Sequence, residues 1–143
     1  MQTQQLIAAA QQLTGLTELG DESILANLNR LVDAFNNEAR LNAGGAARVE
    51  AELVATLANR LRVEKHLAQH PELLSRPIER PMFVFGLPRT GTTLVINLLN
   101  VDPARRSFLR WEAFDSVPPP TPSELHAGPR FEKSQAQLDL VLQ

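Results

Sequence analysis

A short apolar run followed at once by a glycine-rich turn constrains this chain more than any other feature. Residues 82–85 are consecutively apolar and are bounded by Pro81 and Gly86. A run of this length, with aromatic and β-branched members, predicts a strand that is buried on both faces, as in a parallel sheet. The turn occupies residues 86–93, and residues 92–100 then predict a buried helix. The succession of strand, loop and helix predicts an α/β fold.

The glycine-rich turn has the composition of a phosphate-binding loop. Gly86 and Gly91 allow the backbone to curl tightly, so that successive N–H groups point inward. The helix that follows adds N–H groups without partners and the positive end of its dipole. Thr92 and Thr93 place hydroxyl donors at the same helix start. The sequence therefore predicts an anion site at residues 86–93.

The loop departs from the Walker A frame in an informative way. The spacing of Gly86 and Gly91 fits G-x-x-x-x-G-K-[ST], in which the lysine contacts the β- and γ-phosphates of a nucleoside triphosphate. Thr92 stands where that lysine should be, and the only cation inside the loop is Arg89. No Walker B strand that ends in aspartate is visible. A P-loop kinase or NTPase therefore remains an alternative, but the absence of the Walker lysine is evidence against it.

The same residues resemble a known family. The stretch Gly-Leu-Pro-Arg-Thr-Gly-Thr-Thr at 86–93 is similar to the 5'-phosphosulfate-binding loop of sulfotransferases, G-x-P-[RK]-[ST]-G-[ST]-[ST]. The resemblance is strongest to bacterial sulfotransferase-family proteins and to tyrosylprotein-type enzymes. These also have an Asp-Pro or His-Pro step after the helix and then a glutamate, which here are Asp102-Pro103 and Glu112. Trp111 before Glu112, and the prolines at 118–120, further resemble the bacterial group.

The resemblance implies transfer of a sulfuryl group from PAPS (3'-phosphoadenosine 5'-phosphosulfate) to a hydroxyl or amine acceptor, with PAPS as co-substrate and no metal. It implies that Arg89 stabilises the charge that develops on the oxygen between sulfur and phosphorus. Glu112 would be the general base, the alternative being a surface carboxylate or one paired with Arg106 or Arg110. The residues that it implies for donor binding are Gly86, Pro88, Arg89, Thr90, Gly91, Thr92 and Thr93.

The sequence pattern predicts two regions of different structure. Residues 1–76 are expected to be helical, with helices over 4–13, from Asp21 onward, and over 46–69 after a break at Gly44-Gly45. Residues 77–143 are expected to begin a P-loop-like sulfotransferase domain that is truncated at its C-terminus. The reasons are that only one strand is found and that the family's 3'-phosphate site has no match in the sequence.

The last third of the chain predicts less regular structure. Residues 107–114 are expected to include a short extended piece, and the proline cluster around 118–122 excludes a regular helix or a central strand. A final helix could start near Ser123 and becomes clear from 131 to 142. A competing interpretation is a truncated, non-catalytic family member that acts as a helical interaction module.

The composition of the chain excludes several classes of binding partner and of site. The 143 residues carry a formal net charge of −2, whereas a protein that coats nucleic acid usually carries an excess of basic residues, so no nucleic-acid partner is expected. The absence of cysteine excludes disulfides, thiolate zinc sites and a cysteine nucleophile. No apolar stretch reaches the length of a membrane span, so a cytoplasmic protein is expected.

His66 and His70 lie four residues apart, but no third metal ligand is evident, so no metal is predicted. The acceptor would be a small molecule, a glycan or a lipid, and the oligomeric state stays open.

Overall fold

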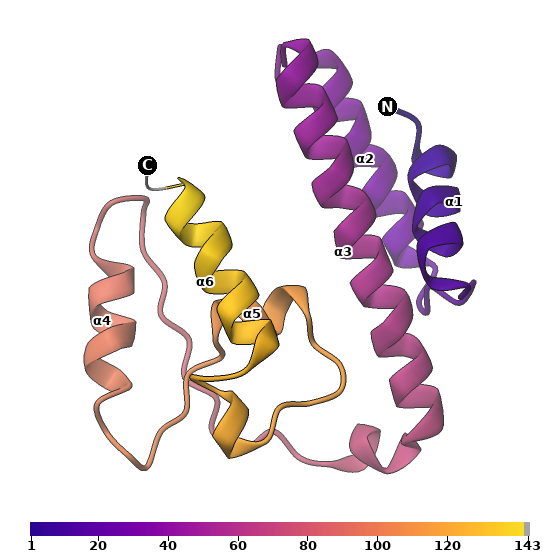
Figure 1. The fold of residues 1–143 in the computed structure, drawn as a ribbon. Helices are drawn as coiled ribbons and strands as arrows, with labels where there is room; N and C mark the ends of the chain where they lie inside the picture. The colour runs from indigo at the N-terminus through magenta and orange to yellow at the C-terminus, as the bar shows by residue number, and fades with distance from the viewer. Residues whose placement is uncertain (142–143) are drawn as a thin grey trace.

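The computed structural model describes residues 1–141, and its regular secondary structure is helical. No strand is present among those residues. Two short 3₁₀ helices accompany the α-helices: η1 (Pro71–Ser75) and η2 (Pro122–Glu124). The α-helices, shown in Figure 1, are α1 (Thr3–Thr14), α2 (Ser23–Asn37), α3 (Ala43–Gln69), α4 (Thr92–Leu99), α5 (Arg110–Phe114) and α6 (Pro129–Val141).

Helices α1, α2 and α3 form a bundle around one apolar core. Each contributes side chains at helical spacing, so that one stripe of each helix is removed from water. Burial of this apolar surface is the main stabilising contribution to the bundle. The buried members of the core are Leu6, Ile7, Ala10, Leu28, Val32, Leu57, Ala58 and Leu61.

The observed ends of these helices agree in part with the ends that the sequence predicts. Helix α1 ends at Thr14, and the predicted Gly15 follows as its C-cap with the left-handed φ of 69° that favours glycine. Helix α2 begins at Ser23, two residues after the predicted cap, and the Asp21 carboxylate accepts the Ser23 N–H at 2.7 Å. The predicted break at Gly44-Gly45 was wrong. The Asn42 side chain accepts the Gly45 N–H at 2.7 Å, and this cap lets α3 begin at Ala43.

The predicted strand at residues 82–85 is not seen, and with it the strand–loop–helix unit of an α/β sheet. The segment has no regular secondary structure, and Phe83 and Phe85 are 71% and 86% exposed. No backbone hydrogen bond joins it to another described segment. A strand exists through its ladder of hydrogen bonds with a neighbour. Residues 1–141 provide no such neighbour, so the apolar run is present without the sheet.

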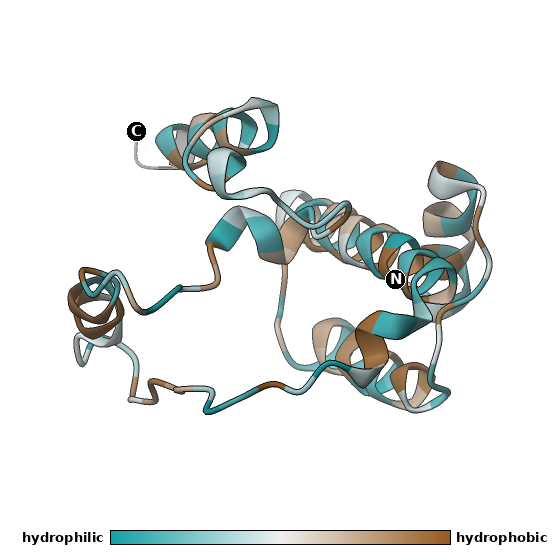
Figure 2. Cartoon of the chain, turned by 90° about the horizontal axis from the view of Figure 1, so that it is seen from below, coloured by the Kyte–Doolittle hydropathy of each residue, from teal (hydrophilic) through white to brown (hydrophobic). Residues whose placement is uncertain are grey.

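The helix after the loop forms where expected but is not buried. Helix α4 stands apart from the other helices in both views, and its hydrophobic colouring in Figure 2 is nearly continuous. Its exposed side chains include Leu94, Val95, Ile96 and Leu98. The prediction of burial required packing partners that the described residues do not supply.

The C-terminal third is more helical than expected. Residues 110–114 form α5 instead of an extended piece, and α5 lies next to α3 and α6. The region near Ser123 forms only the 3₁₀ turn η2, and α6 starts at Pro129. The predicted end of the last helix at 142 lies outside the described residues. Within residues 1–141, no helix combines the length and apolar character needed to cross a membrane.

Candidate functional site

The loop at 86–93 is a closed turn. Pro88 and Arg89 form its tip, and the Thr90 hydroxyl donates to the Leu87 carbonyl at 2.6 Å. The Thr90 N–H also donates to this carbonyl, at 3.3 Å. Arg89 has a φ of 69°, in the left-handed region that residues other than glycine seldom adopt. Gly91 follows with a φ of 91°, a value that suits glycine alone. The loop therefore doubles back on itself before the helix begins.

The close approach within the loop requires glycine at position 86. A β-carbon there would lie 2.6 Å from the Thr90 hydroxyl oxygen and 2.8 Å from the Thr92 methyl carbon. Both distances are below any normal contact. The structure thus brings together Gly86, Thr90 and Thr92, three of the residues that the sequence assigned to one anion site.

The loop leads directly into the N-terminus of α4. Gly91 occupies the N-cap position and has no side chain with which to cap the helix. Its carbonyl accepts the Val95 N–H at 3.1 Å, so the helix begins directly after the turn. The first N–H groups of α4, from Thr92 and Thr93, therefore have no intrahelical partner. Together with the helix dipole, they favour an anionic ligand.

Arg89 is exposed at the tip of the loop and has no ion pair within residues 1–141. A guanidinium offers several N–H donors in a planar fork, which suits oxyanions of phosphorus or sulfur. The loop thus combines one free cation, backbone donors and two threonine hydroxyls.

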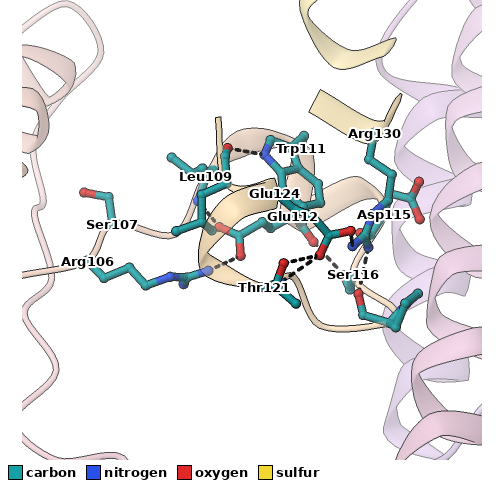
Figure 3. A network of polar contacts seen from close by, with 12 residues as sticks. Arg106, Ser107, Leu109, Trp111, Glu112, Asp115, Ser116, Thr121, Glu124 and Arg130 are labelled. Carbon is teal, nitrogen blue, oxygen red and sulfur yellow. Dashed lines mark hydrogen bonds and ion pairs between the residues drawn. The ribbon is translucent and has the colours of Figure 1, made fainter. Parts of the chain in front are cut away.

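Glu112 lies in a different part of the molecule, on α5. Glu112 is only 3% exposed, and its carboxylate is the one buried carboxylate among the described residues. One carboxylate oxygen accepts the Leu109 N–H at 2.8 Å, which caps α5. The other accepts a hydrogen bond from the Arg106 guanidinium. Of the sequence alternatives, a plain surface carboxylate is excluded, whereas pairing with Arg106 is observed (Figure 3).

Several contacts that the sequence did not reveal hold α5 in place. The Trp111 indole N–H donates to the Leu125 carbonyl at 3.1 Å, and the Arg130 guanidinium lies over the indole ring at 4.8 Å. The buried Asn59 amide of α3 bonds to Ser116, which follows α5. A polar residue on the buried side of α3, between Ala58 and Leu61, was the only sequence signal for this contact.

The two parts of the candidate site, the loop at residues 86–93 and Glu112, therefore lie on different elements of the structure. Residues 86–93 form one unit at the start of α4, and Glu112 belongs to the cluster of α3, α5 and α6. Arg106 extends toward Glu112 from the segment that follows α4 (Figure 3). The rings of His66 and His70 lie with their centroids 4.5 Å apart and their planes tilted by 42°. Across residues 1–141, no three His, Cys, Asp or Glu side chains gather as metal ligands.

Comparison with solved structures finds close likenesses. The crystal structure of the sulfotransferase STF1 from Mycobacterium tuberculosis H37Rv matches with a TM-score of 0.84 and 32% identity, covering 98% of this chain and 39% of that one. The sulfotransferase STF9 from Mycobacterium avium matches with a TM-score of 0.84 and 36% identity, covering 99% of this chain and 37% of that one.

The chain thus spans well under half the length of either solved sulfotransferase. No protein-family model matches the chain, and no curated protein matches it. Both structural matches nevertheless extend over nearly every residue of this chain. Their identity of about a third and their TM-score of 0.84 show that this chain is similar in architecture to the corresponding part of these two sulfotransferases.

Proposed function

We propose that this chain carries the donor loop and the general base of a sulfotransferase that uses PAPS. The acceptor is a hydroxyl or amine on a small molecule, a glycan or a lipid. The observation that carries the proposal is the likeness to two mycobacterial sulfotransferases over at least 98% of the chain, with a G-x-P-R-T-G-T-T loop at residues 86–93.

The residues present fit the 5'-phosphosulfate end of such a donor. The close packing of Thr90 and Thr92 against Gly86 depends on the missing β-carbon of this glycine, and the first N–H groups of α4 lack a side-chain cap. Thr92 and Thr93 would hold the 5'-phosphate through these N–H groups and their hydroxyls. Pro88, Thr90 and Gly91 shape the turn that presents them.

Arg89 supplies the positive charge. When bound, the donor provides an activated sulfuryl group whose bond to the bridging oxygen breaks as sulfur bonds to the acceptor atom. The bridging oxygen keeps the electron pair and leaves as part of PAP, the 3',5'-bisphosphate product. A cation held near that oxygen stabilises the transition state more than the ground state, because the negative charge is still growing.

Glu112 takes the acceptor's proton in this proposal. Its burial and its two hydrogen bonds hold the carboxylate in one orientation, and a carboxylate held in this way can act as a general base toward an acceptor that comes within hydrogen-bond reach. Arg106 balances its charge in the resting protein.

The test measures donor binding and transfer together. PAP should raise the thermal unfolding midpoint of the chain, whereas Mg-ATP should not, since the loop lacks the Walker lysine. Release of PAP from PAPS with 2-naphthol as acceptor should fall by at least about 100-fold in Arg89→Ala, the loss typical for one oxyanion donor. Arg89→Lys should recover part of the rate.

A matched control is Arg62→Ala, an exposed arginine on α3 far from the loop in sequence. It should leave both measurements unchanged. Near-normal transfer by a folded Arg89→Ala variant would contradict the assigned role. Protection by Mg-ATP but not by PAP would favour the kinase or NTPase alternative instead.

A further inference from the structure

Helix α5 is too short to hold its own position. It has five residues, whereas isolated helices shorter than about 12 residues are marginal in water. The carbonyls at its C-terminal end also need partners from outside the helix. The location of Glu112, in the middle of α5, is therefore decided by contacts with the rest of the molecule.

Asn59 of α3 makes the contacts that join α5 to the helical bundle. Its Nδ2 donates to the Ala113 carbonyl at 3.2 Å and to the Ser116 hydroxyl at 3.0 Å. Its Oδ1 accepts the Ser116 N–H at 3.1 Å. The amide thus acts as donor and acceptor at once. A flipped amide would set its NH₂ against the Ser116 N–H, so only one orientation satisfies the contact.

A second hydrogen bond extends this contact to Glu112 itself. The Ser116 hydroxyl, which accepts from Asn59, donates to the Glu112 carbonyl at 2.7 Å. The chain of bonds therefore runs from α3 through Ser116 to the backbone of Glu112. Asn59 is only 9% exposed, and the described residues contain no buried side-chain polar atom without a partner. Loss of this amide would leave the Ser116 N–H and the Ala113 carbonyl without their side-chain partner.

We propose that Asn59 is a positioning residue for Glu112, and that the helical bundle thereby sets the geometry of the acceptor side of the site. The inference rests on the proposed function, because it takes Glu112 as the base. It assigns the bundle a role in proton removal that is separate from donor binding, since Asn59 contacts α5 and the donor loop precedes α4.

The test is a double-mutant cycle. Asn59→Ala should lower kcat for 2-naphthol sulfation on the order of 10- to 100-fold by misplacing the carboxylate. KM for PAPS and protection by PAP should stay within about twofold of wild type. In a Glu112→Gln background, Asn59→Ala should have almost no further effect on kcat, because residues that act through one group are non-additive.

Ser116→Ala provides a milder second variant in case Asn59→Ala fails to fold. It removes only the hydroxyl that links Asn59 to the Glu112 carbonyl. Its effect on kcat should be smaller and should also vanish in the Glu112→Gln background. Thr56→Ala is the matched control on α3, because the Thr56 hydroxyl is exposed and bonds within its own helix. It should leave kcat unchanged.

The only tryptophan of the chain gives a readout that does not depend on catalysis. Trp111 immediately precedes Glu112 in α5 and is buried. Asn59→Ala should shift its emission to longer wavelength and increase quenching by acrylamide. The circular-dichroism signal at 222 nm, which is dominated by the longer helices, should remain close to that of wild type.

The outcomes separate this inference from the proposed function. Unchanged Trp111 emission in Asn59→Ala overturns the positioning role alone, and so do equal losses of kcat with and without the Glu112→Gln substitution. Absence of transfer and of PAP protection in the wild type overturns the proposed function, and the role of Asn59 toward a base falls with it. Non-additive kcat with a shifted Trp111 spectrum supports the inference.

Discussion

Gly86 and Thr90 approach so closely that a β-carbon at Gly86 would lie 2.6 Å from the Thr90 hydroxyl oxygen. The same atom would lie 2.8 Å from the Thr92 methyl carbon. Thr90 is held in place by its bond to the Leu87 carbonyl, so it cannot move aside without opening the turn. The shape of the loop at residues 86–93 therefore depends on the absence of a β-carbon at Gly86.

Gly86→Ala should weaken PAP binding without unfolding the chain. Overpacking of this kind costs about 1–3 kcal/mol, and the loop can relieve it only by opening. We expect binding at least about tenfold weaker, which corresponds to about 1.4 kcal/mol. Calorimetric titration with PAP measures this directly.

The control for this experiment is Gly44→Ala in the first turn of α3. A β-carbon there would meet only the Asn42 carboxamide oxygen at 3.7 Å, an ordinary contact. The substitution should leave PAP binding unchanged and should stabilise the helix by about 0.5–1 kcal/mol. Wild-type affinity in Gly86→Ala would show that the loop adopts another shape when it binds its ligand.

Arg130→Met should destabilise the packing of α6 on α5. The Arg130 guanidinium donates to the Asp115 carbonyl at 3.2 Å and the Pro118 carbonyl at 2.7 Å, and it stacks on Trp111. Methionine keeps an unbranched apolar side chain but leaves both carbonyls without this donor. We expect a loss of about 1–3 kcal/mol in the free energy of unfolding.

Urea unfolding followed by Trp111 fluorescence measures the effect of Arg130→Met. Lys133→Met, at an exposed position on the same helix, is the control and should change stability by no more than about 0.5 kcal/mol. Equal stability of the two variants would mean that the Arg130 contacts contribute nothing net.

Stability should decrease at acidic pH partly through Glu124. The backbone N–H of Thr121, and then its hydroxyl, hold the pKa of Glu124 below its ordinary value of 4.5. A carboxyl whose folded-state pKa is depressed adds stability above its unfolded-state pKa. That stability is lost as the pH falls through the folded-state pKa.

Glu124→Gln therefore should lower the thermal midpoint at pH 7 and have a smaller effect at pH 3. Thermal unfolding of both proteins across this range gives the comparison. A constant difference between wild type and variant at every pH would contradict a contribution from Glu124 ionisation.

The helices were largely predictable because their signals are local. Gly15 ends α1 through its backbone freedom, and the apolar spacing of α1 to α3 reflects one buried stripe per helix. Boundaries were less predictable where one side chain decides them. The Asn42 cap carries α3 across two glycines that would otherwise favour a break.

The strand and the environment of Glu112 depend on distant residues, so sequence pattern alone was insufficient. Residues 82–85 have the composition of a strand, but a ladder needs a second segment. Helix α5 carries weak local signals, and contacts from Asn59 and Arg130 fix it. The turn at residues 86–93 and the helix after it were predictable because glycines and a proline act locally over eight consecutive positions, whereas the role of this turn in donor binding stays a prediction.

An amide NMR titration of the chain with PAP tests whether residues 86–93 hold the phosphate end of the donor. The N–H signals of Gly91, Thr92 and Thr93 should shift most, and these shifts should be lost in Gly86→Ala. Mg-ATP at equal concentration should produce much smaller shifts at the same positions. Unperturbed signals at all three amides under saturating PAP, or equal shifts with Mg-ATP, would contradict a phosphosulfate loop at residues 86–93.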